Sequence, residues 1–130
     1  PFVFMKNGEP VVQCLVRRDE NYPTLYDIVN YAADDMNDFH NALVEIQKYY
    51  KENGAAYIDI GCGNAKLEYY ALFQRLGFRV IGVLQDYYLG DNKSATVENS
   101  IVNRDMVRFR VDLNEKSMET TGYDASGRTN

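Results

Sequence analysis

The sequence has little of what metal sites and disulfide frameworks are made from: two cysteines, Cys14 and Cys62, and a single histidine, His40. One imidazole excludes a metal site built on several histidines, and two cysteines cannot form a disulfide framework or a multi-cysteine metal site. No apolar run approaches the about 20 residues needed to cross a bilayer, and the first residues lack the basic and apolar pattern of a secretory signal. We therefore expect no bound metal, no membrane contact and a location in the reducing cytoplasm.

Positive charge is also scarce, since 14 lysines and arginines face 19 aspartates and glutamates, for a net charge of −5. Binding to phosphate backbones needs clustered lysine and arginine, so nucleic acid is not an expected partner. The 130 residues suffice for one domain with a core, and the hydrophobic share of 45% is ordinary for a globular protein. We expect this domain over residues 1–113. Beyond Leu113 the chain turns polar, and we expect a frayed tail over residues 114–130.

Hydrophobic periodicity predicts a mixed sheet with helices packed on it. Phe39, Leu43, Ile46 and Tyr50 recur at the spacing of one helix face, and Asp34, Asp35 or Asn37 can cap the start of that helix. The predicted strands cover residues 2–5, 11–16, 25–33, 57–61, 78–84 and 106–111, and the predicted helices cover 34–53 and 64–77. A polar loop is expected over residues 86–99. The order β-β-β-α-β-α-β-β is that of an α/β or α+β layer architecture.

A glycine-rich turn, Gly61-Cys62-Gly63-Asn64, follows a short buried strand. Such turns let backbone amides approach a ligand at the start of a helix, and this one looks like the opening motif of class I methyltransferases that bind S-adenosylmethionine. Three observations weigh against that interpretation. Ala65 stands where the motif has its third glycine, no acid ends the next strand at Val83-Leu84-Gln85, and residues 65–130 are too few for the remaining strands of a doubly wound sheet.

The residues after this turn carry a second and more extensive resemblance. The motifs are Gly63-Asn64, Phe73-Gln74-Arg75-Leu76-Gly77-Phe78-Arg79, Asp86-Tyr87-Tyr88, Glu98-Asn99-Ser100-Ile101 and Arg104-Asp105-Met106. They resemble a bacterial branch of the GNAT N-acetyltransferase superfamily, which carries Gly-Asn, Tyr-Gln-Lys-x-Gly-Phe-Arg, Asp-Phe-Phe and Glu-Asn-Gly-Ile-x-x-Arg-Asp-Met in this order. The match spans roughly residues 54–113 with agreeing spacing.

The resemblance implies where a cofactor would bind. In the superfamily acetyl-CoA lies in a V-shaped opening where the fourth and fifth strands separate, which here are the strands over 25–33 and 57–61. The pantetheine arm would pair with the fourth-strand backbone, and the helix after the fifth strand would face the cofactor. The cofactor-binding residues implied in this way are Val29, Asn30, Tyr31 and Ala32 on the strand, with Asn64 and Phe73 after the glycines. Without the resemblance, Asn64 is an ordinary helix N-cap.

The sequence departs from the superfamily at the loop that holds the pyrophosphate. That loop is normally rich in glycine and has a basic or amide residue. Here the segment between Ala33 and Ala42 has Asp34, Asp35 and Asp38 and no glycine. We expect these acids to repel a pyrophosphate. The backbone amides over the first helical turn remain available in principle to an anion; they belong to Phe39, His40, Asn41 and Ala42.

The sequence also departs from the superfamily at the catalytic acid. The superfamily often uses a tyrosine to protonate the departing thiolate, and Phe73 stands at that position here and cannot donate a proton. Tyr70 and Tyr69 lie three and four residues earlier on the same helix face, so either can substitute as the acid. Asp27 on the fourth strand is the predicted base or the acid that holds a water. Asp59 is a weaker candidate, because a strand-end carboxylate with a local hydrogen bond is the favoured interpretation.

The resemblance thus implies an N-acetyltransferase that transfers an acetyl group from acetyl-CoA to an amine of a small molecule or peptide. The alternative is a degenerate GNAT-like domain that binds or dimerises without catalysis, since the phosphate loop is altered. The superfamily's first strand and first two helices have no counterpart before Phe2. Exposed sheet surface invites a partner, so a homodimer is expected.

Overall fold

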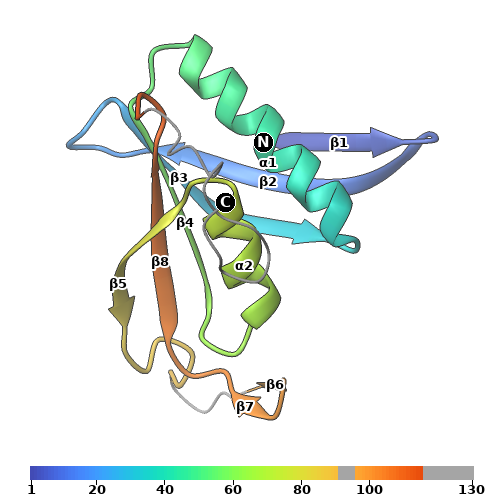
Figure 1. Cartoon of the computed structure of the whole chain (residues 1–130), viewed down its shortest axis with the longest axis vertical. Coiled ribbons are helices and arrows are strands. Elements are labelled where there is room, and N and C mark those ends of the chain that lie inside the picture. Colours follow the sequence, from blue (N-terminus) through green and yellow to red (C-terminus); the bar gives the residue numbers. More distant parts are fainter. Residues whose placement is uncertain (91–95, 116–130) are drawn as a thin grey trace, which may run out of the picture.

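A computed structural model describes residues 1–90 and 96–115 of the chain. A six-stranded sheet has the order β1-β2-β3-β4-β8-β5, and β6 and β7 form a separate hairpin (Figure 1). In chain order the elements are β1 (Phe2–Lys6), β2 (Glu9–Arg18), β3 (Leu25–Ala33), α1 (Met36–Glu52), β4 (Tyr57–Gly63), α2 (Leu67–Arg75), β5 (Arg79–Leu84), β6 (Val97–Glu98), β7 (Ile101–Val102) and β8 (Met106–Asp112). The predicted order of strands and helices and the mixed sheet are confirmed.

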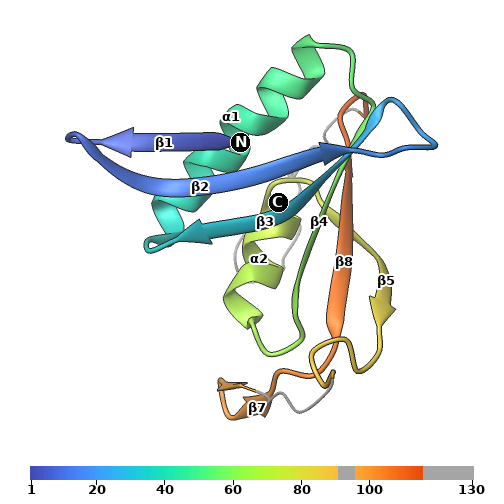
Figure 2. The same cartoon turned by 180° about the vertical axis from the view of Figure 1, so that it is seen from behind.

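Both helices cover the same face of the sheet, as the view from behind in Figure 2 makes plain. Strand β8 shows the two faces by its alternation, because Val107, Phe109 and Val111 are buried while the residues between them are half-exposed. Phe109 packs against α2 through Tyr70 and Phe73. The face of the sheet opposite the helices therefore carries the polar side chains of this strand.

Helix α1 forms because its apolar residues fall on one side and its first turn is capped. Phe39, Leu43 and Ile46 are buried as predicted, together with Ala42. The Asp35 side chain accepts hydrogen bonds from the first free amides of the helix, which makes it the N-cap among the three candidates. Burying each large apolar side chain contributes about 1.5–3 kcal/mol, so this stripe is what holds α1 on the sheet. No helix in residues 1–90 and 96–115 is long and apolar enough to cross a membrane.

Two predicted boundaries were wrong. Strand β4 continues to Gly63 and α2 begins only at Leu67, so Asn64 lies in the turn between them and is not the N-cap. The predicted polar loop contains β6, which pairs with β7 through the turn at Asn99 and Ser100. Both turn residues have positive φ, 53° and 60°, as a tight two-residue hairpin requires. The rest of that loop over 91–95 and the predicted tail over 116–130 lie outside the described residues.

Candidate functional site

The sheet divides between its two parallel strands. β3 and β4 pair from Leu25 only as far as Ile28 opposite Ile60, although β3 continues to Ala33 and β4 to Gly63. Beyond that point β3 stays paired with β2 and β4 stays paired with β8, so the two arms of the sheet separate (Figure 1). We call the place where the two backbones stop pairing the split. The predicted parallel pairing and divergence of the two strands is confirmed.

The predicted cofactor residues of β3 line one side of the split. Asn30 and Ala32 pair with β2 on their other side, and past Ile28 the β3 edge toward β4 has no strand partner in the described part of the chain. The pairing with β2 is irregular at Val29, because Leu15 faces Asn30 while the next residue of β2 faces Ile28. This bulge reverses the alternation of β3. Ile28 and Tyr31 both turn toward the helices, although they are three residues apart.

An aromatic cluster fills the helix side of the split, formed by Tyr31, Phe39, Tyr69 and Phe73. The Tyr31 ring lies 5.1 Å from that of Phe39 and 5.9 Å from that of Tyr69, between ring centres. The Tyr31 hydroxyl donates a 2.7 Å hydrogen bond to the Gly61 carbonyl across the split. Burial raises the pKa of Tyr31 far above its ordinary value, so this hydroxyl stays protonated. The sequence analysis did not predict the cluster or this hydrogen bond. It named Tyr31 only because the strand backbone was expected to bind the cofactor.

The two candidate acids have different surroundings. Tyr69 belongs to the aromatic cluster, and the Lys66 ammonium lies 5.3 Å from its ring centre. Tyr70 packs instead on Phe109 of β8, with ring centres 5.6 Å apart. Burial raises the pKa of both phenols, which keeps them protonated at neutral pH, as a proton donor must be. Phe73 is fully buried within the cluster, and its part in cofactor binding stays a prediction.

The candidate base lies on the opposite face of the sheet. Asp27 accepts a 2.9 Å hydrogen bond from the Arg108 guanidinium, within an ion pair between β3 and β8. Beside it Asp59 accepts two hydrogen bonds from Arg110, at 2.7 and 3.0 Å. The hydrogen bond to Asp59 raises the pKa of Arg110. Asp59 is thus held by an ion pair with the neighbouring strand rather than by a local bond at a strand end, and Asp27 stands apart from the tyrosines rather than beside them.

The start of α1 is where a pyrophosphate would be held. The amides of Asn37 and Asp38 lack a helical acceptor, and the Asp35 carboxylate accepts both, at 2.8 and 3.0 Å. Asp38 also lies 3.6 Å from the Lys6 ammonium. The free amides of this helix therefore come two residues earlier than the sequence suggested, and an acid already occupies them.

The residues predicted to offer amides to an anion lie within the first turns of this helix. The amide of Phe39 donates to the Asp35 carbonyl at 3.0 Å, and the side chains of Phe39 and Ala42 are buried. Asn41 is exposed, and His40 is half-exposed with a ring nitrogen 3.3 Å from the Asn41 amide oxygen. Their part in cofactor binding stays a prediction. Within residues 1–90 and 96–115, no three histidine, cysteine or acidic side chains gather as around a metal ion.

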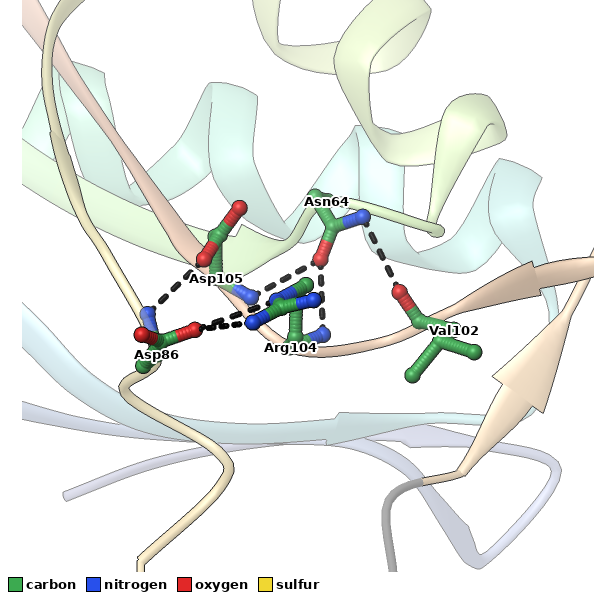
Figure 3. A network of polar contacts seen from close by, with 5 residues as sticks. All are labelled: Asn64, Asp86, Val102, Arg104 and Asp105. Atoms are coloured by element: carbon green, nitrogen blue, oxygen red, sulfur yellow. Dashed lines mark hydrogen bonds and ion pairs between the residues drawn. The ribbon is translucent and has the colours of Figure 1, made fainter.

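Asn64 fastens the end of β4 to the turn before β8 (Figure 3). Its side-chain oxygen accepts from the amides of Arg104 and Asp105, at 2.8 and 2.9 Å, and its nitrogen donates to the Val102 carbonyl at 3.1 Å. Arg104 in turn holds Asp86 through contacts of 3.1 and 2.7 Å. The amide group of Asn64 is thus committed within the protein, and its predicted role facing a cofactor stays a prediction.

Comparison with proteins of known structure shows where this arrangement recurs. The IAA acetyltransferase of Bacillus cereus superposes on 85% of this chain and 75% of its own, with a TM-score of 0.77 at 24% identity. A Bacillus subtilis acetyltransferase in complex with CoA matches 83% of this chain and 72% of its own, with a TM-score of 0.74 at 27% identity. A GNAT family acetyltransferase from Elizabethkingia anophelis with acetyl-CoA bound has a TM-score of 0.75 at 18% identity. The chain has the GNAT fold and resembles GNAT acetyltransferases.

Sequence comparison finds a relative of the same kind. The chain is 40% identical over 63 residues to the uncharacterized N-acetyltransferase YvbK of Bacillus subtilis. That match covers 48% of this chain and 41% of the relative, so it spans less than half of the relative's length. No family model matches the chain. The predicted GNAT fold is confirmed, and the methyltransferase interpretation is set aside.

Proposed function

We propose that this chain transfers the acetyl group of acetyl-CoA to the amine of a small molecule or peptide. The observation that carries the proposal is the split, where no described strand pairs with the β4-facing edge of β3 beyond Ile28. An extended thioester arm can lie along such an edge as an added strand, held by backbone amides and carbonyls. Two of the solved structures that share this fold contain CoA or acetyl-CoA.

The strand half of the site fits this co-substrate better than the helix half. Exposed Asn30 and Ala32 leave the β3 backbone accessible, whereas the start of α1 presents carboxylates where a pyrophosphate would lie. The Asp35 carboxylate would have to release the amides of Asn37 and Asp38 before they could bind an anion. We therefore expect binding through the arm, weakened at the pyrophosphate.

In the proposed reaction the amine nitrogen attacks the thioester carbonyl, a C–N bond forms, the C–S bond breaks, and the sulfur leaves as a thiolate. Acetyl-CoA supplies the activated acetyl group. The β3 amides hold the carbonyl and stabilise its negative charge. Asp27, or a water that it holds, takes the proton that the amine loses. Tyr70 or Tyr69 gives a proton to the thiolate, and Tyr69 is the better placed because its ring lies beside Tyr31 at the split.

The test combines binding with chemistry. Acetyl-CoA at 100 times its dissociation constant should stabilise the folded chain by about 2.7 kcal/mol, visible as a higher melting temperature. Incubation with a panel of primary amines should then give acetylated product by mass spectrometry, less of it for Tyr69→Phe. Absence of both binding and acetylation would overturn the proposal.

A second candidate is a GNAT-like domain that binds without catalysis. The observation in its favour is the capped, acidic start of α1, where the Asp35 carboxylate already accepts the amides of Asn37 and Asp38. Binding of acetyl-CoA without acetylation of any amine would favour this alternative.

We also propose that the protein is cytoplasmic and works as a homodimer. Within residues 1–90 and 96–115, β5 is an edge strand whose one partner is β8. Four of its aliphatic side chains, Val80, Ile81, Val83 and Leu84, are each about half exposed. An edge strand with neighbouring exposed aliphatic side chains is typical of an interaction surface, and a second copy would cover them here.

A further inference from the structure

The bond between Tyr31 and Gly61 lies at a critical place in the sheet. Ile60 is the last residue of β4 that pairs with β3, and Gly61 follows it directly. The Tyr31 hydroxyl reaches the Gly61 carbonyl at 2.7 Å. A side chain of β3 therefore contacts the backbone of β4 just where the two backbones stop pairing.

Both partners of this bond are held in place. The Tyr31 ring is fixed from the helix side by Phe39 and Tyr69, with ring centres 5.1 and 5.9 Å away. On the other side of β4, a Cβ at Gly61 would lie 2.8 Å from the Arg108 guanidinium and 2.8 Å from the Met106 sulfur. Gly61 thus has packed side chains against it and cannot move toward that face without displacing them.

We propose that Tyr31 is a positioning residue: its bond to the Gly61 carbonyl sets the width of the split and so fixes the place of the thioester arm between β3 and β4. This inference rests on the proposed function. The hydroxyl is not needed for packing, since the ring of a phenylalanine would fill nearly the same volume. Among the described residues, this hydroxyl makes the hydrogen bond that joins the two arms of the sheet at this level, and a protonated phenol is suited to that task.

The experiment compares Tyr31→Phe with Tyr26→Phe. Tyr26 lies on the same strand but opposite Ile58, where β3 and β4 still pair, so it is the matched control. Amide hydrogen exchange of residues 29–33 and 61–63 is measured first, without any ligand. The KM and kcat for acetyl-CoA and its dissociation constant are then measured, together with the melting temperature of each variant.

We expect exchange in both segments to become about 3- to 10-fold faster in Tyr31→Phe, as the loss of one hydrogen bond implies. KM and the dissociation constant for acetyl-CoA should rise by a similar factor, with a smaller change in kcat. The control should change neither, at a similar melting temperature. Equal exchange in the two variants, or tighter binding by Tyr31→Phe, would overturn the inference. If the wild type binds no acetyl-CoA, the proposed function fails, and the exchange data still decide whether Tyr31 sets the split.

Discussion

Two glycines that looked like a ligand-binding turn make room instead for side chains of the protein itself. Gly61 lies under Arg108 and Met106, and Gly63 lies against the side chain of Asn103. Asn103 is buried, and its oxygen accepts a 3.2 Å hydrogen bond from the Ala65 amide. A sequence shows that backbone must be approached closely at a glycine, but it does not show by what.

The first prediction follows from Gly63. A Cβ there would come within 2.5 Å of Asn103 Cγ and closer still to its oxygen, so Asn103 must shift and its buried bond to Ala65 must break. We expect Gly63→Ala to lower the free energy of unfolding by about 1–3 kcal/mol in urea denaturation. Gly82→Ala is the control, because nothing lies within 4 Å of a Cβ at that position. Equal stabilities of the two variants would contradict the packing described.

The second prediction concerns the buried thiols. Burial raises the pKa of Cys14 from 9.0 to about 11 and that of Cys62 from 9.0 to about 12. Above pH 9 the unfolded chain therefore releases protons that the folded chain keeps, and stability falls as pH rises. The expected slope is up to about 1.4 kcal/mol per pH unit for each thiol. Urea denaturation at pH 8 and pH 10 should show this loss in the wild type and less of it in a Cys14→Ala/Cys62→Ala variant. The same slope in both proteins would contradict it.

At the scale of elements, local sequence patterns predicted each strand of the main sheet and both helices. The predictions that were wrong depend on contacts between segments distant in the sequence. Asn64 has the side chain of a helix cap, but its partners are the backbone of residues 102–105, about 40 positions away. On β3, strict alternation would put Asp27 and Tyr31 on one face. The bulge at Val29 puts them on opposite faces, and this depends on the register with β2.

The third prediction belongs to the start of α1. If its acids face the pyrophosphate, acetyl-CoA should bind more tightly as salt rises, because screening weakens repulsion between like charges over about 10 Å at 0.1 M. Asp34→Asn, Asp35→Asn and Asp38→Asn together should tighten binding at low salt and remove this dependence. Asparagine also caps helices, so the helix start is preserved. Calorimetric titration at two salt concentrations measures both effects.

The matched control removes the same charge elsewhere, with Glu20→Gln, Glu45→Gln and Glu52→Gln. These residues are exposed, and two of them lie further along α1. Binding that is tight at low salt and weakens with added salt would contradict the repulsion. If the control variant binds acetyl-CoA equally more tightly, the effect comes from net charge and not from the acids at the start of α1.

At the scale of the whole molecule, we predict self-association through β5. Light scattering should give the mass of a dimer, and Ile81→Lys with Val83→Lys should give the mass of a monomer, because two charges would have to be buried at the interface. Val44→Lys is the control, an exposed aliphatic residue on α1. A wild-type protein that stays monomeric at high concentration, or a control that dissociates as well, would contradict the prediction.

The central claim is that acetyl-CoA lies in the split, and its footprint tests that claim most directly. Amide hydrogen exchange is compared with and without saturating acetyl-CoA, and with adenosine 3′,5′-bisphosphate, which lacks the thioester arm. We expect acetyl-CoA to slow exchange over residues 29–33 and 61–63 and to leave β1 unchanged, while the bisphosphate slows neither segment. Protection that leaves both segments of the split untouched, or the same protection from the bisphosphate alone, would contradict the claim.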